Sequence, residues 1–288
     1  MGHKAVLLAE VLRFFETVKL DVFFEGTVGA GGHGKALLEA HPEIKRYLAC
    51  DRDPAAHELA AAVLAPWGKK VEWILGPYAD LSRYLDEKNI EEIDGFLIDI
   101  GVSSMQLDTQ ERGFSFLGDA PLDMRMDPNH PLTAEKMVNE VPEKELARIF
   151  FEYGEERRSR QIARAIVEAR RKKRIRTTRE LVAIVKPVAI WGRLHPATLV
   201  FQALRIAVND ELGQLKKGLE AAISRVRIGG RIAAISFHSL EDRIVKNAFR
   251  EAKEHLEIIT KKPVGPTDQE RKENPRSRSA KLRVAEKK

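Results

Sequence analysis

Residues 21–34 read DVFFEGTVGAGGHG, and this stretch decides the fold. Its apolar start predicts a strand, and Gly29, Gly31 and Gly34 then form a G-x-G-x-x-G loop that opens a predicted helix. Glycines at such a position let the backbone approach a ligand closely at the end of the strand. The loop alone does not identify a ligand site, because an ordinary tight turn gives the same pattern.

The sequence around this loop alternates short apolar runs with helical patterns. This rhythm predicts a parallel sheet built from right-handed crossover units. Strands are expected over residues 21–25, 46–50, 71–75 and 93–100, and helices over residues 6–15, 34–40, 54–64 and 79–86.

The strand rhythm stops after residue 100, and helical patterns follow a loop rich in Gly, Asp and Pro. Helices are expected over residues 142–151 and 155–173, and after the capping box Thr177-x-x-Glu180. We therefore predict a Rossmann-like α/β domain formed by residues 1–105 and 200–288, with an all-helical domain inserted at residues 106–199.

Strand-like sequence returns near the C-terminus. A long helical stretch is expected over residues 197–226, a helix over 240–252, and strands over 231–237, 256–261 and 280–284. Residues 263–279 are rich in Pro, Arg, Lys and Ser, and we expect them to form a long mobile hairpin loop.

Composition narrows the class of protein. The 288 residues are 43% hydrophobic and 32% charged, which is enough to bury a full core. No apolar run reaches the roughly 18 residues of a membrane span, and no signal peptide is recognisable, so we expect a cytoplasmic protein without a membrane partner. The single cysteine, Cys50, excludes an intrachain disulfide and a multi-cysteine metal site, and no structural metal is expected.

Positive charge is clustered in two regions. Residues 157–179 hold eleven Lys or Arg against one acid, Glu168, and residues 261–288 hold ten against four acids. Each region is a candidate track for phosphates of a nucleic acid, although a solvated helix surface is the alternative for the first. The predicted RNA-binding residues are Arg157, Arg158, Arg171, Lys172, Lys173 and Arg174.

Acidic residues end three of the predicted strands. Asp51, at the end of the second strand, can accept hydrogen bonds from ribose hydroxyls, which indicates an adenosine-containing cofactor, either NAD or S-adenosylmethionine (SAM). Glu25 and Asp99 would repel a pyrophosphate, and a carboxylate suits the ammonium group of SAM. Tyr78 follows the third strand, where it would stack on adenine or lie half-buried in the core.

Several longer segments carry a family resemblance. The chain resembles the RsmH (MraW) family of SAM-dependent methyltransferases, which modify the exocyclic N4 of a cytidine in bacterial 16S ribosomal RNA. The matching segments are residues 3–12, 29–33, 99–108, 111–116, 121–127, 195–198, 201–206, 208–209 and 236–243. Two departures are Glu25, where the family has Asp, and Leu199-Val200, where it has Arg-Thr.

The resemblance implies a class I SAM-dependent methyltransferase fold, SAM as cofactor and a small-subunit RNA substrate. It leaves the oligomeric state open, and a homodimer is allowed. By position it implies that SAM contacts Gly31, Gly32, His33, Asp51, Tyr78, Asp99 and Gln106, to which the charge argument adds Glu25.

Methyl transfer needs alignment of donor and acceptor more than it needs catalytic groups. Asp99 is the candidate acceptor for the N4 hydrogens of the target base, helped by Ser103 or Ser104, or else it serves the cofactor only. The base would have to be unpaired or flipped out of a duplex. His238 either borders the pocket or is structural. Arg125 is either held between Asp123 and Asp127 or lies at the pocket mouth.

Two other functions fit parts of the sequence. One is a nicotinamide-dependent oxidoreductase, which the acidic strand ends oppose. The other is a non-catalytic RNA-binding or assembly protein, which the intact glycine loop opposes.

Overall fold

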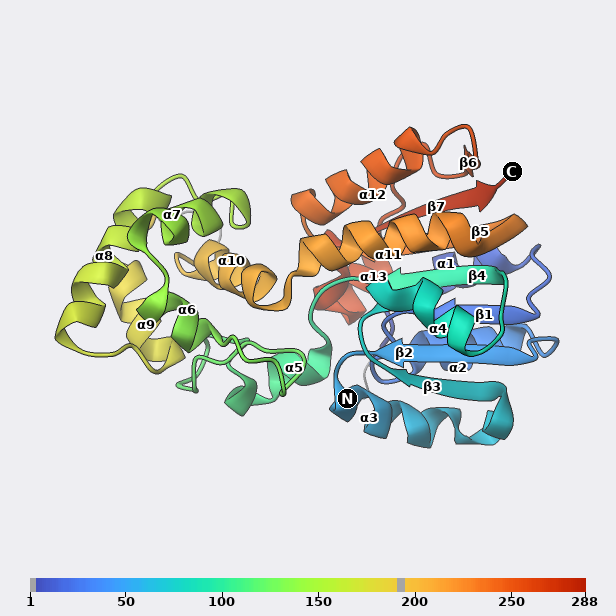
Figure 1. Ribbon diagram of the computed structural model, residues 1–288, viewed down its shortest axis with the longest axis horizontal. Helices are drawn as coiled ribbons and strands as arrows, with labels where there is room; N and C mark the ends of the chain where they lie inside the picture. The colour runs from blue at the N-terminus through green and yellow to red at the C-terminus, as the bar shows by residue number, and fades with distance from the viewer. Residues whose placement is uncertain (1–3, 191–194) are drawn as a thin grey trace. The chain divides into compact units, whose positions relative to one another are not determined.

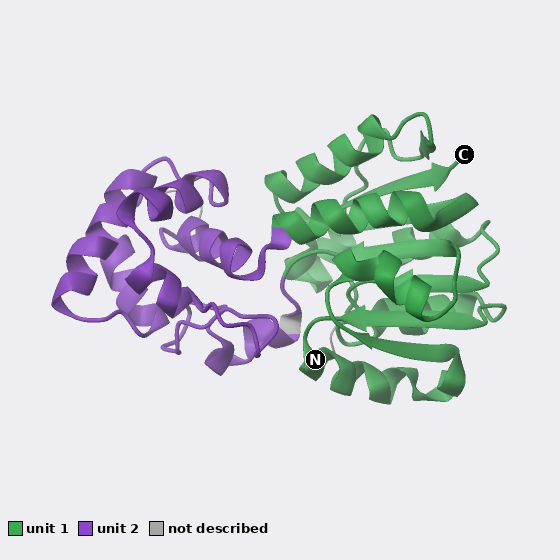
Figure 2. Cartoon of the chain, viewed as in Figure 1, with its two compact units in different colours: residues 1–101, 212–288 green, residues 102–211 purple. Residues whose placement is uncertain are grey.

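The computed structural model describes residues 4–190 and 195–288, apart from the side chain of Ser104 (Figure 1). The chain divides into two compact units (Figure 2). Unit 1 consists of Met1–Gly101 and Leu212–Lys288, and unit 2 of Val102–Glu211. His3, the first residue of the family resemblance, lies outside the described residues.

Unit 1 is built on a seven-stranded sheet of order β3-β2-β1-β4-β5-β7-β6. The strands from β3 to β5 are parallel, and β7 runs antiparallel to both of its neighbours. Their bounds are β1 Val22–Glu25, β2 Arg46–Asp51, β3 Val71–Leu75, β4 Ile93–Asp99, β5 Val226–Ser236, β6 Leu256–Ile258 and β7 Lys281–Lys287. All seven predicted strands are present in this unit, and the largest difference is that β5 begins five residues early.

Helices cover both faces of the sheet (Figure 1). One face is covered by α1 (Leu8–Phe15), α2 (Gly32–Ala40) and α3 (Pro54–Leu64), and the other by α4 (Leu81–Glu87), α11 (Glu211–Arg225) and α12 (Ser239–Glu251). Each face has its own apolar core, the first beneath α1, α2 and α3 and the second beneath α4, α11 and α12. Successive strand residues point to opposite faces, so Phe23 packs in the first core and Phe24 in the second. Cys50 is buried in the second core, as predicted.

Unit 2 is helical and has its own apolar core. Its helices are α5 (Ser104–Asp108), α6 (Ala134–Glu140), α7 (Glu143–Glu152), α8 (Ser159–Lys172), α9 (Thr178–Val185) and α10 (Thr198–Asn209). Val102 and Leu107 pack on this core, and Val200 and Phe201 are part of it. The unit therefore extends beyond the predicted bounds of 106 and 199 at both ends. Short 3-10 helices lie at Ala65–Lys70, Tyr78–Asp80, Gln110–Arg112 and Pro275–Ser279.

The helical stretch expected over residues 197–226 is confirmed, and the backbone turns left-handed at Asp210 (φ 47°) between its two helices, α10 and α11. One prediction for the C-terminal half is wrong. The mobile loop expected over residues 263–279 contains helix α13 (Asp268–Glu273), capped by the Thr267 hydroxyl, which accepts a hydrogen bond from Glu270 N at 3.1 Å.

No helix in the described part of the chain is long and apolar enough to cross a membrane.

Candidate active site at the carboxyl edge of the sheet

Three carboxylates gather where strands β1, β2 and β4 end. Glu25 pairs with Ala49 of β2 and with Leu97 of β4, so Asp51 and Asp99 each lie two positions further along their strands. Residues two positions apart in a strand point to the same face. All three carboxylates therefore meet on one face of the sheet edge, where the strand order reverses between β1 and β4 and where ligands bind in open α/β sheets.

The glycine loop packs closely against Glu25. Gly31 is the N-cap of α2 and has a left-handed backbone (φ 79°), which a glycine adopts without strain. A Cβ at Gly34 would lie 3.0 Å from Glu25 Oε2 and 3.1 Å from the Tyr47 hydroxyl. Only a residue without a side chain lets the first turn of α2 come this close to the buried pair.

Glu25 is buried, and its Oε2 accepts a hydrogen bond of 2.8 Å from the Tyr47 hydroxyl. Burial raises the pKa of Glu25 to about 8; the Tyr47 hydrogen bond opposes this rise, and the nearby Asp99 and Asp51 add to it. A cation beside this carboxyl group would favour its ionised form. The sequence did not reveal Tyr47 as the partner of Glu25.

Asp51 fastens the glycine loop to strand β2. Its Oδ2 accepts from Gly29 N and its Oδ1 from Asp53 N, both at 3.0 Å. Burial raises the pKa of Asp51, and these two backbone hydrogen bonds oppose the rise. Because each carboxylate oxygen has more than one lone pair, Asp51 can also accept hydrogen bonds from ribose hydroxyls.

Asp99 ends β4 beside the loop. Its backbone N donates to Thr27 Oγ1 at 2.7 Å, whereas its Oδ1 is buried without a hydrogen-bond partner among the described residues. Burial raises the pKa of Asp99 to about 8, and the charge of Glu241 adds to this rise. A buried acceptor left unsatisfied costs about 1–3 kcal/mol, so this oxygen suits a ligand that brings a donor or a positive charge.

His33 and Tyr78 are both buried in unit 1. The Nε2 atom of His33 lies 2.9 Å from the carbonyl oxygen of Val6, a contact between α2 and the N-terminal segment that the sequence did not reveal. Tyr78 packs against α11, since a Cβ at Gly218 would lie 2.5 Å from Tyr78 Cδ2. The structure thus shows core packing for Tyr78, and stacking on adenine stays a prediction.

The remaining predicted site residues belong to unit 2. Ser103 and Gln106 form a capping box at the start of α5, in which Ser103 Oγ accepts from Gln106 N at 3.2 Å and Gln106 Oε1 accepts from Ser103 N at 3.1 Å. The side chain of Ser104 lies outside what the structure describes. The catalytic role of the two serines and the cofactor role of Gln106 stay predictions.

His238 caps helix α12 in the structure. Its Nδ1 accepts from Glu241 N at 3.4 Å, and its Nε2 lies 2.9 Å from Glu241 Oε1. Glu241 is fully buried, and its Oε2 accepts from Phe237 N at 2.8 Å. These contacts favour the structural role for His238. The influence of Glu241 on Asp99 was not visible in sequence, because it depends on the pairing of β4 with β5.

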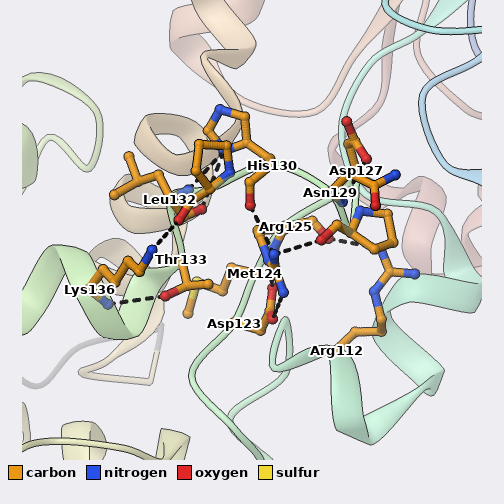
Figure 3. Close-up of polar contacts among 12 residues, drawn as sticks. Arg112, Asp123, Met124, Arg125, Asp127, Asn129, His130, Leu132, Thr133 and Lys136 are labelled. Carbon is orange, nitrogen blue, oxygen red and sulfur yellow. Dashed lines mark hydrogen bonds and ion pairs between the residues drawn. The ribbon is translucent and has the colours of Figure 1, made fainter.

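Arg125 fastens a loop of unit 2 (Figure 3). Its guanidinium donates twice to Asp123, at 2.9 and 2.7 Å, and also to the carbonyl oxygens of Pro128 and His130. Asp127 instead accepts from Asn129 N at 2.8 Å. Of the two carboxylates expected to hold Arg125, Asp123 therefore makes the hydrogen bonds, and Asp127 acts on Arg125 through its charge.

The six predicted RNA-binding residues fall into two sets. Three have partners: Arg158 donates to Val188 O at 2.8 Å, Lys173 pairs with Glu180 at 2.7 Å, and Arg174 pairs with Glu135 and Glu140 at 2.8 and 3.0 Å. The other three make no side-chain hydrogen bond or ion pair within the described ranges: Arg157, Arg171 and Lys172.

Val200, one of the two residues that depart from the family pattern, is fully buried in the core of unit 2. This departure therefore supplies apolar packing to α10.

Comparisons with known proteins identify the family of the chain. The MraW methylase family model matches residues 1–288. The chain is 49% identical over 307 aligned positions to ribosomal RNA small subunit methyltransferase H of Geobacter sulfurreducens, covering 99% of both chains. It is 49% identical to the protein of the same name from Persephonella marina, covering 98% of both.

A solved structure shows the fold. A Clostridium thermocellum protein described as a candidate rRNA methylase superposes with a TM-score of 0.51 at 10% identity, covering the whole of both chains. The predicted fold class, the enzyme class and the cofactor are therefore confirmed. The chain belongs to the MraW methylase family of SAM-dependent methyltransferases.

Proposed function

We propose that this protein transfers a methyl group from SAM to the exocyclic N4 of a cytidine in 16S ribosomal RNA. The observation that carries the proposal is the cluster of Glu25, Asp51 and Asp99 beside the glycine loop, with one buried oxygen of Asp99 unsatisfied. The relatives' name supports a small-subunit RNA as the substrate, and the family resemblance supports the cytidine N4.

The residues present fit SAM better than a nicotinamide cofactor. Carboxylates with raised pKa values in a buried cluster favour a ligand that carries positive charge, and they disfavour the two negative charges of a pyrophosphate. In this proposal Asp51 holds the ribose hydroxyls, and Gly31 and Gly32 let the backbone approach the cofactor. SAM, when bound, supplies a methyl group on a sulfonium centre.

Asp99 has a second task in the proposal. The N4 lone pair of cytosine is delocalised into the ring, and an acceptor for the N4 hydrogens favours the tetrahedral nitrogen that attack requires. The unsatisfied Oδ1 of Asp99 is such an acceptor. The positive charge of bound SAM would lower the pKa of Asp99 from about 8. Asp99 would then be ionised when the base arrives.

Unit 2 supplies the RNA surface in this proposal. Arg157, Arg171 and Lys172 have charges that no acid of the described chain neutralises, and phosphates would pair with them. An assembled small subunit as substrate, a cytoplasmic location and a homodimer also belong to the proposal.

One experiment tests the reaction and the substrate together. The protein is incubated with methyl-labelled SAM and small subunits that lack the modification, and the labelled nucleoside is then mapped. We expect label in one N4-methylated cytidine. Label in another base, or in no RNA while SAM binds, would contradict the proposal, and small subunits that already carry the modification are the control.

A further inference from the structure

Residues 4–7, here called the N-terminal strap, pack against the glycine loop. The carbonyl oxygen of Val6 lies 2.9 Å from His33 Nε2. Gly32, the residue before His33, packs tightly against the strap, since a Cβ at Gly32 would lie 3.1 Å from Ala5 Cβ. The strap thus touches two consecutive residues of the predicted cofactor site.

The N-terminal strap also contacts helix α13, which lies close to the other end of the sequence. Leu7 N donates to Glu270 Oε1 at 2.8 Å. Asn274 Nδ2 donates to the Lys4 carbonyl oxygen at 3.2 Å, and the Lys4 ammonium pairs with Glu273. Helix α13 and the residue after it therefore hold both ends of the strap.

Of these interactions, the one made by Glu270 is the most consequential. Leu7 is fully buried and has a left-handed backbone (φ 54°, ψ 34°), a strained conformation for a leucine. An unsatisfied buried N–H would add to the cost of that conformation. By accepting a hydrogen bond from Leu7 N, Glu270 stabilises the turn at Leu7 and, with it, the packing of the strap against the glycine loop. The ion pair of Lys4 with Glu273 is exposed and contributes less.

Helix α13 is itself anchored to the sheet. Val264, which precedes it, exchanges backbone hydrogen bonds of 2.9 and 2.8 Å with Leu282 of β7. Ser277, which follows it, is fully buried and donates through its hydroxyl to Asn274 O at 2.8 Å. These contacts on both sides of α13 fix the position of Glu270 relative to the core of unit 1.

We propose that Glu270 is a positioning residue for cofactor binding. Acting through the N-terminal strap, it holds Gly32 and His33 in the arrangement that meets SAM. This inference rests on the cofactor site proposed above. Because the strap touches the glycine loop, removing the hydrogen bond between Glu270 and Leu7 should weaken SAM binding and leave the methyl-transfer step nearly unchanged.

The test compares three substitutions in the full-length protein. Glu270→Ala removes the acceptor and should raise the Kd and KM for SAM roughly 10-fold, with kcat within about twofold of the wild type. Glu270→Gln keeps an acceptor oxygen and should bind SAM nearly as the wild type does. Asp268→Ala is the matched control, because it removes a carboxylate of the same helix that pairs with Arg271 instead of the strap.

Hydrogen exchange supplies a readout that is independent of activity. In Glu270→Ala, peptides covering residues 4–12 and 28–36 should exchange faster than in the wild type, whereas Asp268→Ala should leave both unchanged. If Glu270→Ala does not fold, Glu270→Asp, which keeps the charge but draws the oxygen back, should weaken SAM binding in the same direction.

Three results would overturn the inference: an unchanged Kd for SAM in Glu270→Ala, an equally weakened affinity in Asp268→Ala, or an affinity in Glu270→Gln as weak as in Glu270→Ala. Failure of the cofactor site itself would look different. In that case wild-type protein would not bind SAM, or Asp51→Ala would leave its affinity unchanged, whereas failure of this inference alone would leave SAM binding and its dependence on Asp51 intact.

Discussion

At the scale of single residues, Asp99 carries the sharpest prediction. Asp99→Asn keeps the shape of the side chain but removes the charge and offers an amide N–H where an acceptor is needed. If Asp99 accepts the N4 hydrogens, kcat should fall at least about 100-fold, with a change of about 10-fold or less in the Kd for SAM. Single-turnover rates and calorimetric titration measure the two effects.

Other outcomes for Asp99→Asn have clear meanings. An equal fall in rate and in SAM affinity would make Asp99 a cofactor residue only, and full activity would reject both roles. Glu39→Gln, an exposed carboxylate change on helix α2, is the control for a general effect of removing a charge.

Glu25 predicts a pH dependence of stability. Its pKa is about 8 in the folded protein and near the ordinary glutamate value of 4.5 when unfolded, so the folded state binds more protons between these values. The stability of the wild type should therefore fall as pH rises from about 5 to about 8. Glu25→Gln, which cannot ionise and can still accept from Tyr47, should reduce that fall by at least about 1 kcal/mol.

Urea unfolding at the two ends of this pH range measures the difference. Glu39→Gln again serves as the control, since its carboxylate is exposed and should leave the pH dependence as it is in the wild type. A wild-type pH dependence in Glu25→Gln would show that Glu25 ionises as an ordinary carboxyl group.

At the scale of elements, helix α8 and the turn after it carry unpaired and paired cations in adjacent positions. The double variant Arg171→Gln with Lys172→Gln removes two charges without a partner among the described residues, and Lys173→Gln with Arg174→Gln removes two charges already engaged by acids. RNA affinity is plotted as its logarithm against the logarithm of the salt concentration. If α8 binds the RNA backbone, the first double variant should make the slope of this plot less steep by roughly 0.7–0.9 for each phosphate that is no longer neutralised. The second double variant should change this slope less.

Filter binding at several salt concentrations measures these slopes. Equal slopes for the two double variants would mean that ion pairing within the protein does not decide which cations meet RNA. A wild-type slope in both would remove α8 from the phosphate track and favour the second basic region, residues 261–288.

At the scale of the whole molecule, the two units have separate predicted tasks. SAM should slow hydrogen exchange in unit 1 at the glycine loop and at the ends of β2 and β4, near Gly31, Asp51 and Asp99. A small-subunit RNA fragment should slow exchange over residues 157–176 of unit 2. RNA protection of residues 263–279 instead would assign binding to unit 1, and SAM without effect on unit 1 would contradict the cofactor site.

The sequence by itself determined the features that depend on neighbouring residues. Apolar periodicity, the Gly29-to-Gly34 loop and the acids at strand ends predicted the seven strands and the three carboxylates at the sheet edge, because a parallel sheet brings the carboxyl ends of its strands together. The inserted helical unit was also visible, since a long absence of strand patterns is a local property of the sequence.

Only the tertiary structure decided which side chains meet across long separations in the chain. Tyr47 bonded to Glu25, Glu241 acting on Asp99, and Glu270 bound to Leu7 at a separation of 263 residues have no local signature. The same holds for charge, because eleven similar cations in residues 157–179 are told apart only by the acids and carbonyl groups that folding places beside some of them. Such pairings are set by the packing of elements, and packing depends on the whole chain at once.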